Sequence, residues 1–253
     1  MTTYYVYHAA ASSASPYDTW AKAAPKVETI SQIDGAGDTI YVSDAHSEDS
    51  TAAVTWTLAG TLASPTKIIC GDDAAEPPTT NTATAVIQTT GAYGVTINGT
   101  GYFEGLIFNI GATSSGTAQL LLNYANTNTQ TYRNCDFKIA TTGATGFIYV
   151  CSAQSTFSSV SKWENCDVKF AAADQKIVIS SAVFRWHGGS ILSGGTSPTN
   201  LFYPNGPSDI LVDGVDFSNG AQGINIFGIG TQQPGIRGII RNCKLPASWN
   251  GSL

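Results

Sequence analysis

The sequence predicts an all-β protein, namely a right-handed single-stranded parallel β-helix with a short N-terminal helical cap. Three observations predict this fold class. Most of the chain consists of short β-branched and aromatic runs separated by glycine, asparagine, serine or proline. One pattern of six residues recurs along the chain at intervals of 23 to 31 residues, which is typical of stacked repeats. A single segment has its apolar residues at helical spacing.

That helical segment comes first and covers residues 17–33. Within this segment we expect Asp18 to cap the start of the helix and Pro25 to split the helix into two pieces. We therefore divide the chain into residues 1–36, an N-terminal strand and helical cap, and residues 37–253, a β-helix of about eight coils. The cap is expected to cover the open edge of the first coil. Strands at 38–42 and 67–70 are expected to form the earlier coils.

The recurring pattern then marks the later coils. One of its positions is always asparagine or glycine: Gly105, Asn134, Asn165, Gly188, Gly214 and Asn242. These two residue types tolerate the left-handed backbone of a tight turn. The next position is small or apolar, and its steps along the chain are 29, 31, 23, 26 and 28 residues. Alternating apolar residues on both sides predict an inward strand face. A sandwich or barrel is the alternative, but it predicts evenly spaced hairpins with Asn-Gly turns.

Equivalent positions on neighbouring coils are expected to lie about 4.8 Å apart and to form outward columns. One column reads Ile107, Asp136, Asp167, Ser190, Asp216 and Lys244, and the other reads Glu104, Arg133, Glu164, His187, Asp213 and Arg241. Clustered carboxylates are what a polysaccharide hydrolase or a calcium-dependent lyase needs. If the protein is an enzyme, its catalytic candidates are Asp136, Glu164, Asp167, Asp213 and Asp216. Alternation of acids and bases favours instead a solvated ladder without catalysis.

Other side chains are candidates for contact with a glycan or a protein partner. Leu201, Phe202 and Tyr203 lie between prolines in the predicted loop 193–209, where they would form an exposed apolar cluster. The alternative is that this loop folds down on its own coil. Trp186 and His187 precede a turn and complete the candidate set, and for His187 a surface hydrogen bond is favoured over catalysis.

Composition excludes several classes of function. Twelve Lys and Arg against eighteen Asp and Glu give a net charge of −6, so we expect no nucleic-acid partner. No apolar run approaches the roughly 20 residues of a membrane span, and we expect neither membrane insertion nor a signal peptide. Five cysteines without a C-x-x-C motif, and three histidines far apart, predict no metal site and no cofactor. Cys135 and Cys166 are expected to be reduced and stacked in the core.

The order Trp20, Ile30, then Gly37 to Val42, followed by coils marked Asn-Cys-Asp-Phe, resembles the opening of pectate-lyase-like parallel β-helix proteins. The stretches 191–196, 211–216 and 241–246 are similar to β-helix virion proteins of tailed bacteriophages. The catalytic signatures of pectate lyases and polygalacturonases have no match in the sequence.

The resemblance implies a virion structural protein: a capsid-attached decoration or head spike, made in the host cytoplasm, that stabilises the particle and contacts the host surface. Its partners would be other capsid or tail proteins and two sister chains in a homotrimer. The sequence stops directly after a coil, so we expect a partner, a sister chain or further residues to cover that end. The alternative is a tail spike or tail fibre protein that binds or cleaves host surface polysaccharide.

Overall fold

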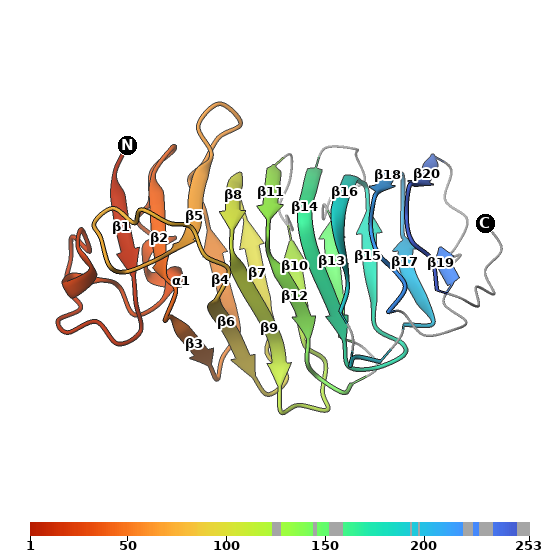
Figure 1. The fold of residues 1–253 in the computed structure, drawn as a ribbon, viewed down its shortest axis with the longest axis horizontal. Coiled ribbons are helices and arrows are strands. Elements are labelled where there is room, and N and C mark those ends of the chain that lie inside the picture. The colour runs from red at the N-terminus through yellow and green to blue at the C-terminus, as the bar shows by residue number, and fades with distance from the viewer. Residues whose placement is uncertain are drawn as a thin grey trace.

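The protein is described by a computed structural model that covers residues 1–122, 128–143, 146–151, 159–192, 194–196, 198–219, 225–227 and 235–246. Strands make up 51% of it and helices 3%, so the prediction of an all-β chain with parallel strands is confirmed. In Figure 1 the strands run across the long axis of the molecule, from β1 at one end to β20 near the other. No helix in the described part of the chain is both long and apolar enough to cross a membrane.

The N-terminal segment contains β1 (Thr3–Val6), the 3-10 helix η1 (Trp20–Lys22) and α1 (Val27–Ile30). The predicted helix 17–33 is thus two short pieces on either side of Pro25, which has no N–H to donate. The predicted cap residue is wrong. The side chain of Thr19 caps η1 by accepting the Lys22 N–H at 3.3 Å, whereas Asp18 forms an ion pair with the Lys22 ammonium at 3.4 Å.

After α1 the chain passes repeatedly through three ladders of parallel strands, and we call one such passage a repeat. The first ladder contains β1, β2 (Thr39–Ser43), β5 (Thr66–Gly71), β8 (Gly101–Glu104), β11 (Thr129–Arg133), the first part of β14 (Ser159–Phe170) and of β16 (Ala182–Ile191), β18 (Ser208–Asp213) and β20 (Ile236–Arg241). The second contains β3 (Ser47–Ser50), β6 (Ala85–Thr90), β9 (Leu106–Ala112), β12 (Asp136–Ile139) and the ends of β14 and β16.

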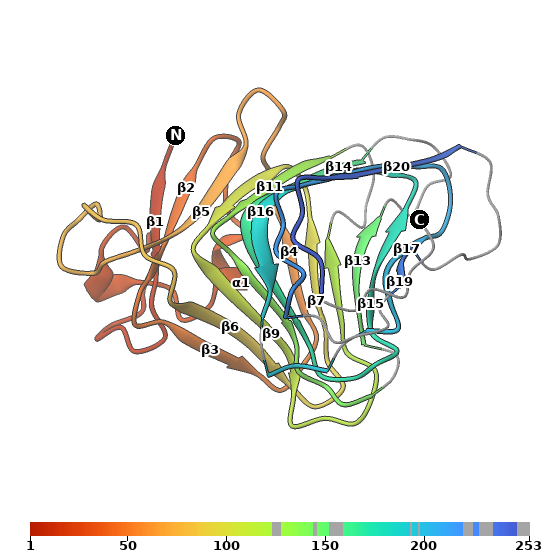
Figure 2. The ribbon, with the colours of Figure 1, turned by 45° about the vertical axis from the view of Figure 1, so that its right-hand side comes forward.

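The third ladder is a separate seven-stranded sheet. It contains β4 (Val54–Thr57), β7 (Val95–Asn98), β10 (Gln119–Leu122), β13 (Phe147–Cys151), β15 (Lys176–Ser180), β17 (Asn200–Pro204) and β19 (Asn225–Phe227). Figure 2 shows β4, β7, β13 and β15 as one wall of the molecule and β3, β6 and β9 as another. Within each ladder, every strand pairs in parallel with the equivalent strand of the next repeat, so the repeats stay in phase.

The turn between the first and second ladders carries the marker residue of the repeat. All six predicted marker residues have positive φ: Gly105 (73°), Asn134 (50°), Asn165 (51°), Gly188 (65°), Gly214 (69°) and Asn242 (54°). Only glycine and, at some cost, asparagine adopt this backbone routinely, and the prediction of a left-handed turn is confirmed at every position.

One large apolar core runs through the repeats, and a small second cluster of Tyr5, Trp20 and Ala23 lies in the N-terminal segment. The large core contains Val6 and Val27 of the N-terminal segment as well as Phe217 far along the chain, so residues 1–36 share their core with the ladders. Aromatic side chains of successive repeats touch inside it. The ring centroids of Phe103 and Tyr132 are 4.5 Å apart, and those of Trp163 and Trp186 are 5.4 Å apart.

The inward cysteine column behaves as predicted. Cys135 and Cys166 are buried and free, and each thiol lies within hydrogen-bond distance of a backbone carbonyl, Arg133 O at 3.3 Å and Tyr132 O at 3.4 Å respectively. Burial raises the pKa of the Cys166 thiol well above its ordinary value. The reduced stack is confirmed for this pair.

Candidate functional site

The two outward columns exist as predicted, because strand pairing places their members side by side. In the first column the pairs are Asp136 with Asp167, Asp167 with Ser190, Ser190 with Asp216, and Asp216 with Lys244. In the second column the pairs are Glu104 with Arg133, Arg133 with Glu164, Glu164 with His187, His187 with Asp213, and Asp213 with Arg241. These side chains point outward because their neighbours along each strand fill the core.

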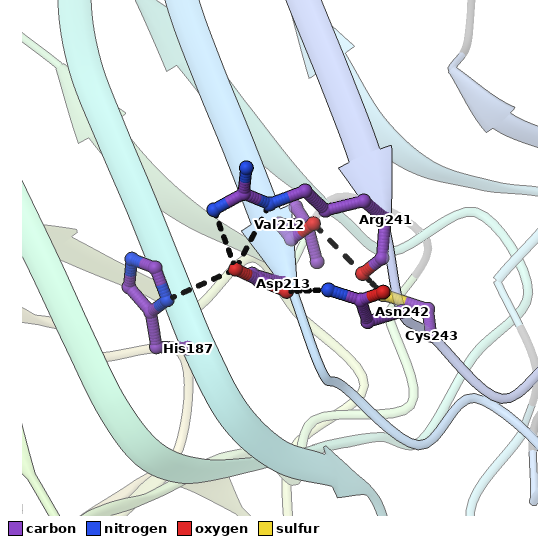
Figure 3. Close-up of polar contacts among 6 residues, drawn as sticks. All are labelled: His187, Val212, Asp213, Arg241, Asn242 and Cys243. Carbon is purple, nitrogen blue, oxygen red and sulfur yellow. Dashed lines mark hydrogen bonds and ion pairs between the residues drawn. The ribbon is translucent and has the colours of Figure 1, made fainter.

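Asp213 has the largest set of polar partners in the two columns (Figure 3). The Nε of Arg241 donates to one of its oxygens at 2.9 Å, and Asn242 donates to the other at 2.8 Å. The Nδ1 of His187 lies 3.8 Å from the same carboxylate. The hydrogen bonds from Asn242 and Arg241 lower the pKa of Asp213 below its ordinary value, so the carboxylate is held in its ionised form.

Three carboxylates of the first column also have polar partners. Asp216 accepts the Ser218 N–H at 2.8 Å and pairs with the Lys244 ammonium at 3.1 Å. The hydrogen bonds from Ser218, first its hydroxyl and then its N–H, lower the pKa of Asp216. In the same column, Asp136 forms an ion pair with the Lys138 ammonium at 2.9 Å, and Asp167 accepts a hydrogen bond from the Ser190 hydroxyl at 2.8 Å.

Two of the five candidate catalytic carboxylates, Asp213 and Asp216, are held in the ionised form. A glycosidase needs one carboxylic acid whose pKa is raised and a second carboxylate about 5–9 Å away. The pKa values of Asp213 and Asp216 are lowered instead of raised. Asp136 forms an ion pair with Lys138, and Asp167 accepts a hydrogen bond from Ser190. Glu164 is exposed between Arg133 and His187. Three of the five candidate carboxylates, Asp136, Asp213 and Asp216, therefore form ion pairs with neighbouring cations.

Three of the five candidates for glycan or partner contact, namely Trp186, Leu201 and Phe202, are buried, so the alternative of a loop folded onto its own coil holds for the last two. Trp186 is fully buried, packs against Trp163 and donates its indole N–H to the Cys166 carbonyl at 3.2 Å. Leu201 and Phe202 are 1% and 0% exposed, because the predicted loop contains strand β17, whose side chains enter the core.

Tyr203 and His187 do reach the surface. The Lys176 ammonium lies 4.7 Å from the Tyr203 ring centroid, on the outer side of the third ladder. The side chain of His187 is 49% exposed, in the second column. Since these two residues lie on different ladders, the structure does not unite them into one contact surface.

A groove that the sequence did not predict lies beside the first column. Its volume is about 390 Å³, and Lys138 and Lys169 project into it from neighbouring strands. Its opposite wall is the turn 194–196, which belongs to the following repeat. The recurrence of lysine two residues after the aspartate of Asn-Cys-Asp was the available signal. Within the described residues, no three His, Cys, Asp or Glu side chains are placed to hold a metal ion.

Comparison with known proteins gives no relative. No protein family, curated protein or solved structure matches the chain. The columns and the groove are therefore interpreted from their own geometry.

Asp213→Asn is expected to lower the melting temperature at neutral pH but not in strong acid. The pKa of Asp213 is lowered in the folded state, so its contribution to stability is present above the ordinary value of 3.8 and is lost as the pH falls below it. The measurement is the melting temperature of both proteins at about pH 7 and about pH 2. Asp174→Asn, at an exposed carboxylate outside the columns, is the control. An equal difference at both pH values would contradict the assignment.

Proposed function

We propose that this chain is a structural protein of a tailed-bacteriophage particle, a capsid-attached decoration or head-spike protein. The observation that supports it best is the combination of ladders in register around a continuous apolar core with the outward carboxylates Asp213 and Asp216 already paired with neighbouring cations. Such a molecule offers a rigid surface for adhesion and stabilises a particle through buried area, without a chemical step.

The proposal includes a finer description of the fold. Each repeat runs once through the three ladders and the next repeat pairs with it in parallel. Crossover connections between parallel strands of one sheet are right-handed in about 98% of cases. We therefore take the three ladders as the faces of a right-handed, single-stranded parallel β-helix.

In this proposal the protein is made in the host cytoplasm and acts on the virion, where its partners are other virion proteins and two sister chains. Repeat proteins of this kind present long, regular surfaces for such contacts. The homotrimer is tested by sedimentation of the purified chain. A particle of about three times 26.4 kDa is expected, and a monomer at every concentration would contradict that part of the proposal.

The position on the particle is tested by copy number. Quantitative mass spectrometry of purified particles compares the amount of this chain with that of the major capsid protein. A ratio near one, or a simple fraction of it, supports decoration of the capsid lattice. A far smaller ratio places the chain at the tail or at a single vertex and supports the second candidate below. Absence from the particles would overturn both virion assignments.

The second candidate is a tail spike or tail fibre protein that binds host surface polysaccharide. The groove beside the first column favours it, because a concave site with a few placed polar groups is how small ligands are held. Cleavage of the polysaccharide would in addition require Asp136 and Asp167 to act on the glycan. Loss of reducing-end release in Asp136→Asn and Asp167→Asn would support an enzyme, and no release by the unmodified protein from any host glycan would exclude one.

A further inference from the structure

Two ammonium groups line the groove, and within the described residues only that of Lys138 forms an ion pair. Lys138 on β12 lies directly opposite Lys169 on β14, and such pairs of positions on neighbouring strands are about 4.8 Å apart. Like charges in direct opposition destabilise a sheet unless a counter-charge is present. This concentration of positive charge occurs in a chain whose net charge is −6.

The described carboxylates supply only part of the counter-charge. Asp136 forms the ion pair with Lys138 at 2.9 Å. Asp167 likewise lies two residues before Lys169 on its strand, but it accepts a hydrogen bond from the Ser190 hydroxyl at 2.8 Å. None of the ion pairs in the described part of the chain includes Lys169. The ammonium group of Lys138 is therefore paired with a carboxylate, and that of Lys169 is not paired with any described carboxylate.

The wall opposite the lysines is held in place by its own contacts. The Thr196 N–H donates to Phe170 O at 2.8 Å, and the Thr196 hydroxyl donates to Ala171 O at 2.9 Å. Gly195 approaches the strand so closely that a Cβ there would lie 2.7 Å from Phe170 O. A Cβ on Gly194 would lie 3.7 Å from the Lys169 Nζ. The turn therefore stands directly against the unpaired ammonium.

The remaining lining consists of small side chains and strand backbone, because the larger Ile139 and Phe170 side chains are buried in the core. Asn109 continues the column of Lys138 and donates its amide to Gln88, and the other contributors are strand backbone and the turn itself. A volume of about 390 Å³ exceeds that of a free oxyanion and lies in the range of small-molecule sites. The space beyond the ammonium groups suits a ring that carries hydroxyl groups.

We propose that this groove binds a saccharide that bears an oxyanion (a carboxylate, a sulfate ester or a phosphate ester). The anionic group lies between the ammonium groups of Lys138 and Lys169, and the sugar ring rests against the turn 194–196. The inference deepens the host-contact part of the proposed function. Its test uses the purified chain whereas the copy-number test uses particles, so either can fail without the other.

The test is a titration of the ¹⁵N-labelled protein, followed by the NMR signals of the Gly194, Gly195 and Thr196 amides. The probes share one ring and differ in charge: glucuronate, glucose 6-sulfate, glucose 6-phosphate and neutral glucose, with inorganic sulfate and phosphate as further arms. The charged sugars are expected to shift these amides in a saturable way, and glucose is not. Lys169→Met is expected to weaken binding by about tenfold or more.

Two variants separate charge in the groove from charge elsewhere. Lys162→Met removes an exposed ammonium from the first-ladder part of the same strand, β14, and is expected to leave the affinity unchanged. Asp136→Asn releases Lys138 from its ion pair and is expected to tighten binding several-fold, the opposite of what a catalytic aspartate predicts for activity. A retained amide spectrum shows that each variant is folded, and Lys138→Met repeats the test at the second ammonium group.

Three results would overturn the proposal. The first is equal affinity of the unmodified protein and Lys169→Met for the charged sugars. The second is binding of glucose as tight as that of glucuronate, because the ammonium groups would then play no part. The third is inorganic sulfate binding as tightly as glucose 6-sulfate, which would mean an adventitious ion only.

Discussion

Gly189→Ala is expected to destabilise the protein by about 3 kcal/mol or more. Gly189 has a φ of +88°, and a Cβ there would lie 1.9 Å from the carbonyl oxygen of Cys166. That oxygen belongs to the backbone of the preceding repeat, where Cys166 pairs with Gly189. It cannot move aside without loss of ladder hydrogen bonds, so the steric cost adds to the strain of a left-handed alanine. The measurement is urea-induced unfolding of both proteins.

Gly214 provides the matched control, because it also has a positive φ of +69° but nothing lies within 4 Å of a Cβ placed there. Gly214→Ala is therefore expected to cost only the backbone strain, about 1–2 kcal/mol. Gly214→Asn is expected to cost less still, since asparagine occupies the same turn position at Asn134 and Asn165 with φ near 50°. Equal losses for Gly189→Ala and Gly214→Ala would show that the close approach to Cys166 is not the cause.

Trp163→Ala is expected to cost about 3–5 kcal/mol, the usual loss for removal of a large buried aromatic side chain. Trp163 is fully buried, and its ring centroid lies 4.4 Å from that of Phe137, 4.9 Å from Phe184 and 5.4 Å from Trp186. The cavity would lie between repeats that contact it from both sides. A loss below about 1 kcal/mol in urea unfolding would contradict this packing.

Phenylalanine at the same two tryptophan positions separates packing from hydrogen bonding. The indole N–H of Trp163 is buried without a partner among the described residues, whereas that of Trp186 donates to the Cys166 carbonyl at 3.2 Å. Trp163→Phe removes an unsatisfied donor, and Trp186→Phe removes a made hydrogen bond. We expect Trp186→Phe to be the more destabilising of the two by about 1 kcal/mol. The reverse order would contradict the assigned hydrogen bond.

The columns could be predicted from the sequence because two independent signals agree there. The asparagine or glycine fixes the turn, and alternation along a strand has a period of two, so the register follows without ambiguity. Asp136 opposite Asp167 and His187 opposite Asp213 are both confirmed. Trp186 is in register with Tyr132 and Trp163 on the inward face of the first ladder, so its burial follows from the same alternation, and the surface position expected of it is wrong.

The third ladder could not be predicted in the same way. Its strands are short and lack a marker residue, and β17 begins among Gly, Ser, Pro and Thr residues that are typical of a loop. The sequence therefore leaves open whether Leu201 and Phe202 are exposed or folded onto their own coil. The groove escaped prediction for a different reason. Lys138 and Lys169 were visible as recurring lysines, but the turn that faces them comes from another repeat and meets them only in the folded chain.

The parallel pairing of each repeat with the next has a consequence for how such a molecule can change. A repeat contacts mainly the repeats on either side, so stability is close to a sum of local and nearest-neighbour contributions. Duplication or deletion of a whole unit, for example the 31 residues that separate Cys135 from Cys166, leaves every inward and outward face in phase. Mutation can therefore lengthen or shorten the reach of the molecule while the surfaces at its two ends keep their chemistry.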